Sequence, residues 1–170
     1  MKVTVDLRND CTPTWAPDNL LCKQWVRAAL KAVKHPVDSS VSISLVTEKT
    51  SAELNTKYRG KAGATNVLSF PSEYPENLAL ATAFQPLGDV VICADVVARE
   101  AREQNKDLKA HWAHLTIHGL LHLIGYNHEQ EAEARQMEQL EISALQSLGM
   151  ANPYSSENEP AENAKLHRVQ

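Results

Sequence analysis

The residues HLTIHGLLHLIGYNH (114–128) carry a histidine pattern from which the local structure can be predicted. His118 and His122 are four residues apart, so both imidazoles lie on one face if the segment is helical. Gly125 can adopt the left-handed conformation that ends a helix and turns the chain, which brings His128 to the same point. Three neutral imidazoles with one open position are the usual ligands of catalytic zinc. We therefore predict one zinc ion per chain, bound by His118, His122 and His128.

Two further histidines precede these three on the same predicted helix. A single histidine on an apolar helix face is usually a hydrogen-bonded core residue, and we interpret His111 in this way. His114 lies four residues before His118, on the same face. It is therefore a candidate to line the cavity, either behind the ligands or in contact with a substrate.

The glycine after the first ligand separates this pattern from that of the zinc peptidases. Their signature HExxHxxGxxH has the same ligand spacing, but it places a glutamate there as the general base that activates water. In this chain that position is Gly119, which has no side chain to move a proton. The spacing therefore predicts a metal hydrolase without peptidase chemistry. We expect Gly119 to let another backbone, or the substrate, approach the metal.

Length and composition fit one domain with a hydrophobic core. No apolar run is as long as a membrane span, and the N-terminal residues lack the apolar core of a signal peptide. The three cysteines have no CxxC spacing, which fits a reducing compartment. We therefore expect a cytoplasmic protein with one catalytic domain, residues 1–150, and a polar, disordered tail, residues 151–170.

Hydrophobic periodicity predicts an α+β fold. Alternating apolar residues predict strands at residues 2–8, 40–47, 66–70 and 88–93. Apolar stripes and capping residues predict helices at residues 17–34, 51–59, 94–105, 108–124 and 129–148. Thr50 and Glu53 form a possible capping box for the second helix, and the proline-rich residues 71–86 are expected to be an irregular loop. We expect one mixed sheet of about four strands packed with several helices, and the metal site on the histidine-bearing helix and the turn after it.

Charge is distributed unevenly along the chain. The net charge is −4, but residues 129–170 carry 8 acidic and 3 basic side chains, which leaves the part with the histidines near neutral. A basic cluster at Lys57, Arg59 and Lys61 can bind a polyanion locally. The second basic cluster, which we interpret as solvated helix charges, comprises Arg99, Arg102, Lys106 and Lys109.

Three segments together resemble the YbeY family, metal-dependent endoribonucleases of ribosomal RNA maturation. They are HGLLHLIGYNH (118–128), LNTKYRGKAGATNVLSFP (54–71) and LGDVVIC (87–93). The resemblance covers about residues 40–150, in the family's order. It implies that the three histidines are the zinc ligands and that Arg59 acts beside them. A guanidinium can pair with phosphate oxygens through two hydrogen bonds, which suits that role, although helix capping or a surface ion pair is the alternative for Arg59.

The resemblance also implies a substrate and partners. It indicates a zinc-dependent endoribonuclease that cuts single-stranded RNA in maturation of the small ribosomal subunit and in ribosome quality control. The implied partners are single-stranded RNA, ribosomal RNA and the small subunit, with no membrane and no DNA. Two alternatives stay open: a non-enzymatic ribosome assembly factor with a structural metal, and a metallopeptidase-like hydrolase.

Several further residues are candidates for the site. Asn66 and Ser69 lie on the strand next to Arg59 and can position groups there. The family usually has Asp before the third histidine, whereas this chain has Asn127, which keeps a hydrogen-bond acceptor but loses the charge. His114 and Glu129 are the candidates for proton transfer.

Overall fold

The computed structural model describes residues 1–155, and residues 156–170 lie outside the described part. Along the chain the elements are β1 (Val3–Asn9), α1 (Asn19–Ala32), β2 (Asp38–Val46), α2 (Glu48–Arg59), β3 (Val67–Pro71), α3 (Glu76–Thr82), β4 (Phe84–Cys93), α4 (Ala94–Glu103), α5 (Leu108–Leu123) and α6 (Glu131–Ser147). The predicted α+β class is confirmed.

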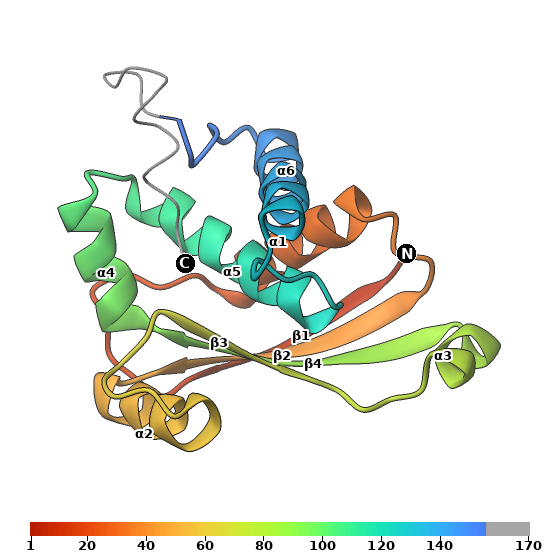
Figure 1. Ribbon diagram of the computed structural model, residues 1–170, viewed down its shortest axis with the longest axis horizontal. Helices are drawn as coiled ribbons and strands as arrows, with labels where there is room; N and C mark the ends of the chain where they lie inside the picture. Colours follow the sequence, from red (N-terminus) through yellow and green to blue (C-terminus); the bar gives the residue numbers. More distant parts are fainter. Residues whose placement is uncertain (156–170) are drawn as a thin grey trace.

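The four strands form one mixed sheet in the order β1-β2-β4-β3. β1, β2 and β4 run parallel, while β3 pairs antiparallel with β4 and lies at the edge. Figure 1 shows α1, α5 and α6 on one face of the sheet and α2 on the other side. α5 packs on β3 and β4, so its histidines lie near the β3 edge of the sheet, and this arrangement positions the site.

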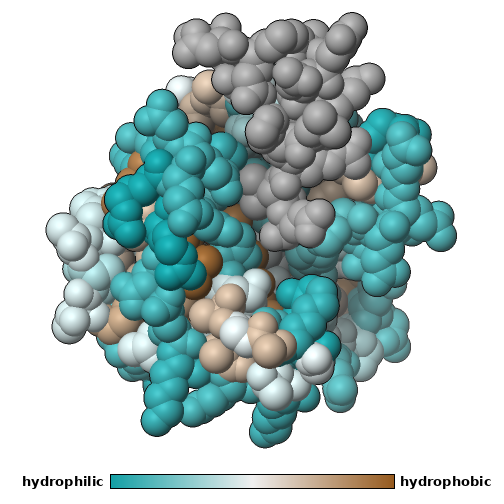
Figure 2. Space-filling model, turned by 60° about the vertical axis from the view of Figure 1, so that its left-hand side comes forward, coloured by the Kyte–Doolittle hydropathy of each residue, from teal (hydrophilic) through white to brown (hydrophobic). Residues whose placement is uncertain are grey.

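Residue patterns explain this layering. Along β2, Val41, Ile43 and Leu45 are buried, while the serines between them are only half-buried, so one face of the sheet packs on the helices. α5 is buried over nearly its whole length, from His111 to Leu121, as expected for a helix that is apolar on all sides. α5 is therefore the central helix of the fold, and its histidines lie inside the protein. By contrast, the face drawn in Figure 2 carries mostly hydrophilic side chains.

Two of the predicted local features are wrong. α2 begins at Glu48 because the side chain of Thr47, and not a capping box at Thr50, accepts the hydrogen bond from the first turn, at Thr50 N. Residues 71–86 are not irregular throughout, because α3 forms within them and β4 already begins at Phe84. The first residues of β4 are held in the sheet by parallel pairing with the start of β2, a contact that no local pattern reveals.

In the segment after α6, Tyr154 contacts the folded domain. The predicted tail of residues 151–170 is described only to Ser155, and the rest of it lies outside the described residues. Within the described part, the hydroxyl of Tyr154 donates a hydrogen bond of 2.8 Å to Glu141 on α6. None of the helices in residues 1–155 is both long enough and apolar enough to cross a membrane.

Candidate metal centre

The fold brings the three predicted ligands together. α5 carries His118 and His122 on one face, and Gly125, with φ at +99°, turns the chain so that His128 approaches both. One nitrogen of each ring lies within 4.8 Å of the others. The Nε2 atoms of His118 and His122 are 3.1 Å apart, close to the separation of about 3.3 Å between tetrahedral ligands of zinc. The three side chains therefore fit a metal ion held by imidazole nitrogens.

Burial decreases across the three histidines, from buried His118 through half-buried His122 to exposed His128. Burial, together with the neighbouring His118 and His128, lowers the pKa of His122 to about 4. His122 is therefore neutral at physiological pH, and its ring nitrogen keeps the lone pair that a metal ion needs.

A cleft of about 540 Å³ opens beside the histidines, between the end of α2, the edge strand β3 and the loop after α5. It collects most of the residues predicted for the site. Its lining includes Arg59, Lys61, Asn66, Ser69, His118, His122, Asn127, His128 and Glu129. His114 is the predicted site residue that is absent from this lining.

Arg59 reaches the cleft because of how α2 ends. It is the last residue of the helix, and Gly60 closes the helix in the left-handed conformation, with φ at +67°. The following loop is fixed to α2, since Asn55 Nδ2 donates to Gly63 O at 2.9 Å and Ser51 exchanges two hydrogen bonds with Thr65. The guanidinium of Arg59 is exposed, and no carboxylate of residues 1–155 forms an ion pair with it.

The second basic cluster lies in a different place, around α4. Arg99 and Arg102 line a groove of about 570 Å³ that also contains the carboxylates of Glu48 and Asp95. Arg99 pairs with Glu48 at 2.7 Å, and both side chains are about half exposed. This mixed-charge groove contains none of the three histidines of the cleft.

Asn66 lines the cleft, but its polar atoms are used within the protein. Its Nδ2 lies 3.2 and 3.3 Å from the two carboxylate oxygens of Glu100, and its Oδ1 accepts from the N–H of Val67. His111 Nε2 lies 3.0 Å from Glu100 Oε1. Burial raises the pKa of Glu100, but the hydrogen bonds from His111 and Asn66 outweigh it and lower that pKa. We call Asn66, Glu100 and His111 the α4 network; it ties α5 to α4 and β3.

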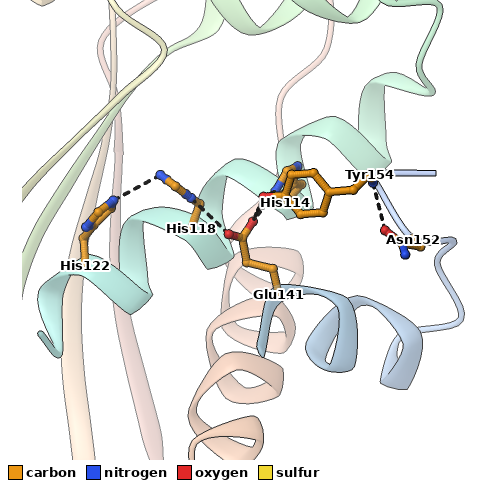
Figure 3. A network of polar contacts seen from close by, with 6 residues as sticks. All are labelled: His114, His118, His122, Glu141, Asn152 and Tyr154. Carbon is orange, nitrogen blue, oxygen red and sulfur yellow. Dashed lines mark hydrogen bonds and ion pairs between the residues drawn. The ribbon is translucent and has the colours of Figure 1, made fainter. Parts of the chain in front are cut away.

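His114 points away from the cleft, toward α6, where it contacts Glu141. Figure 3 shows the Glu141 side chain reaching from α6 to a point between His114 and His118. Glu141 Oε1 lies 3.3 Å from His118 Nδ1, and Glu141 Oε2 contacts His114 Nε2 and accepts from the hydroxyl of Tyr154. We call His114, His118, Glu141 and Tyr154 the α6 network.

Charge in the α6 network is carried by the carboxylate. Burial opposes ionisation of Glu141, but hydrogen bonds from His114 and His118 outweigh it and hold its pKa at about 2. Burial also lowers the pKa of His114, which favours the neutral ring. Glu141 is therefore an ionised carboxylate, only 1% exposed, held by hydrogen bonds next to a candidate metal ligand.

Glu141 is a functional candidate that the sequence interpretation missed. A signal was present, because Glu141 lies in the middle of the apolar stripe formed by Met137, Leu140 and Ala144. An acidic residue in such a stripe needs a buried partner. The carboxylate that contacts a predicted ligand is thus Glu141, whereas Asn127 is exposed in the cleft lining.

Gly119 has a different role from the one expected. A Cβ at this position would lie 2.8 Å from a methyl of Val90 and 2.9 Å from a methyl of Val67. Ser69 Oγ donates to Gly119 O at 2.7 Å, so β3 is also hydrogen-bonded to the helix at this point. Gly119 therefore lets α5 pack closely on side chains of the sheet, rather than letting a backbone or substrate approach the metal.

Comparison with known proteins identifies the family. The family model described as Endoribonuclease YbeY matches residues 13–149. The protein named Endoribonuclease YbeY from Nitrosococcus oceani is 47% identical over 156 residues, which cover 92% of this chain and 99% of that protein. The protein of the same name from Stenotrophomonas maltophilia is 54% identical over 135 residues, 79% of this chain and 83% of its own.

A solved structure supports the fold. The solution structure of a Thermotoga maritima protein has a TM-score of 0.54 and covers 93% of this chain and 99% of its own. Its sequence identity is 24%, so this likeness bears on the fold alone. The family match covers every residue of the cleft lining and of both networks except Tyr154. This chain therefore belongs to the YbeY family of endoribonucleases.

Proposed function

We propose that this protein is a cytoplasmic, zinc-dependent endoribonuclease that cleaves single-stranded RNA. We further propose that it acts in maturation of ribosomal RNA of the small subunit and in ribosome quality control. The observation that carries the proposal is the meeting, in one cleft, of three histidines and an arginine that has no carboxylate partner among residues 1–155. Membership of the endoribonuclease family supports RNA as the substrate.

His118, His122 and His128 are the residues that would hold the zinc ion. When bound, zinc supplies Lewis acidity toward a phosphoryl oxygen and lowers the pKa of water. The protein's part is to present the nitrogens, and a neutral His122 beside an oriented His118 meets that need. The exposed position of His128 leaves the outer side of the cleft open to a long substrate.

Arg59 is the group that we propose to bind the scissile phosphate. Its guanidinium is exposed and free of carboxylate partners within residues 1–155, so two of its N–H groups can point at phosphate oxygens. Lys61, in the same cleft lining, adds positive charge. Charge that develops on the phosphate during cleavage is stabilised by such preorganised donors.

The cleft also narrows the choice of a group for proton transfer. Of the two candidates, His114 is buried against Glu141 and Tyr154 and does not line the cleft. Glu129 does line it, and it is the one carboxylate in the lining among the described residues. We therefore propose Glu129, rather than His114, as the acid or base for a proton on substrate or water.

The test is cleavage of a defined single-stranded RNA by the purified protein, with and without a chelator, beside His118→Ala. Arg59→Ala should keep its melting temperature, because the side chain is exposed, and should cleave about a hundredfold more slowly or worse. Arg99→Ala is the matched control, since it removes an exposed arginine outside the cleft, and it should cleave like the parent. An Arg59→Ala protein that cleaves normally, or that unfolds, would contradict the role of Arg59.

A further inference from the structure

The carboxylate of Glu141 is buried in the interface between α5 and α6, with both oxygens occupied. One oxygen, Oε1, faces His118 Nδ1 at 3.3 Å. The other, Oε2, contacts His114 Nε2 and accepts a hydrogen bond of 2.8 Å from the Tyr154 hydroxyl. A carboxylate that is held at both oxygens has a fixed orientation, and it imposes that orientation on the ring it touches.

The two nitrogens of His118 face different partners. Nε2 points toward Nε2 of His122, at 3.1 Å, and Nδ1 points toward Glu141. If Nε2 gives its lone pair to a metal ion, the single proton of the neutral ring must lie on Nδ1. That N–H then donates to Oε1 of Glu141, which fixes the ring tautomer and increases the basicity of Nε2.

Tyr154 connects this carboxylate to the segment that follows α6. Its backbone N–H donates to Asn152 Oδ1 at 2.8 Å, so the turn at residues 152–154 directs the side chain back to the helix. Its ring packs edge-on against His114, with centroids 5.3 Å apart. The phenol therefore covers the side of the Glu141 carboxylate that faces away from His118, as Figure 3 shows.

From these contacts we propose that Glu141 is a positioning residue of the metal centre and that Tyr154 holds it in place. The segment after α6 thereby sets the affinity of the three histidines for zinc, although none of its described residues lines the cleft. This inference rests on the proposed zinc site. It does not depend on the RNA substrate, because it concerns only how His118 is held.

The experiment measures zinc binding by the full-length protein without RNA. Metal-free parent, Glu141→Gln and Tyr154→Phe are each titrated with Zn²⁺ against a chromophoric chelator, and circular dichroism of the metal-free forms checks the fold. Glu100→Gln is the matched control, because it makes the same acid-to-amide change in the α4 network. Loading with Co²⁺ adds a spectrum that reports the coordination geometry.

Glu141→Gln should bind zinc about 10- to 100-fold more weakly than the parent, with an altered Co²⁺ spectrum. Tyr154→Phe should lose about fivefold, the effect of one hydrogen bond, and Glu100→Gln should stay within about twofold of the parent. If Glu141→Gln does not fold without metal, Tyr154→Phe decides the question, since it removes only a hydroxyl.

Three results would overturn the inference: parent-like affinity in the folded variants, an equal loss in Glu100→Gln, or a parent that binds no zinc. A parent that binds zinc but does not cleave RNA would contradict the proposed function and leave this inference standing.

Discussion

The α4 and α6 networks both pair a histidine of α5 with a glutamate of a neighbouring helix. In the α4 network, His111 Nε2 meets Glu100, and the other ring nitrogen is buried without a hydrogen-bond partner among residues 1–155. In the α6 network, His118 Nδ1 meets Glu141, and the other ring nitrogen faces His122 in the cleft. The same residue pair thus joins two helices in one place and holds a candidate ligand in the other.

The two glutamates differ as well. Glu141 is only 1% exposed and has both oxygens occupied, whereas the side chain of Glu100 is 24% exposed and reaches the cleft only through Asn66. The two pairs therefore differ in what the second ring nitrogen of the histidine faces. In the structural pair, His111 and Glu100, it is buried in the protein, whereas in the metal-orienting pair, His118 and Glu141, it faces the cleft. Four experiments test this distinction, from the largest expected effect to the smallest.

Removing one histidine from the metal centre and one from the α4 network gives the largest expected difference in zinc binding. His122→Ala should abolish zinc binding, from about one ion per chain to none detectable, because two imidazoles are too few for a stable site. His111→Ala should keep the ion but lower the free energy of unfolding by about 1–3 kcal/mol, since it removes the histidine partner of the Glu100 carboxylate. Elemental analysis and urea unfolding measure the two effects. Loss of metal in both variants would remove the distinction.

Gly119→Ala tests the close packing of α5 on the sheet, which positions the histidines of both networks. The added methyl would lie under 3.0 Å from both Val90 and Val67, so α5 or the sheet must move, at a cost of about 1–3 kcal/mol. A double-mutant cycle with Val90→Ala should show coupling, because that change removes the nearest methyl. Additive effects in urea unfolding would mean that Gly119 is not needed for this contact.

A pair of truncations separates Tyr154 from the residues after it. A chain ending at Ser155 should keep its fold and zinc affinity, because the polar sequence of residues 156–170 has few groups that could anchor it. A chain ending at Pro153 loses the phenol as well, and it should bind zinc about fivefold more weakly. Zinc titration of both against the full chain measures the difference. Equal affinities in the two would count against the α6 network.

The smallest effect is a pH dependence from Glu100. Its pKa is lower in the folded protein than the usual 4.5, so its ionised form stabilises the fold above about pH 4.5. This stabilisation is lost as the pH falls through the lowered pKa. Glu100→Gln should therefore be less stable than the parent at pH 7, by about 1 kcal/mol or less, and the gap should narrow in acid. A gap that stays constant with pH would show that Glu100 does not titrate in this way.

The sequence by itself determined the features that depend on residues close together in the chain, such as helix faces, helix ends and strand alternation. The spacing of His118 and His122 and the turn at Gly125 follow from helix geometry and glycine's conformational freedom. The end of α2 at Gly60, which places Arg59 at the cleft, follows from the same rule. Alternation along β2 likewise predicted a strand with one face on the helices.

Only the tertiary structure decided which distant groups meet. Glu141 is 23 residues from His118, and although its place in the apolar stripe of α6 predicts burial, only the packing of α6 on α5 brings it beside the ligand. The contact of Tyr154 with Glu141 and the fit of Gly119 against Val90 arise in the same way. Local rules reach one helical turn or two strand positions, whereas these contacts require elements to be packed, and the sequence pattern does not encode that packing within any short window.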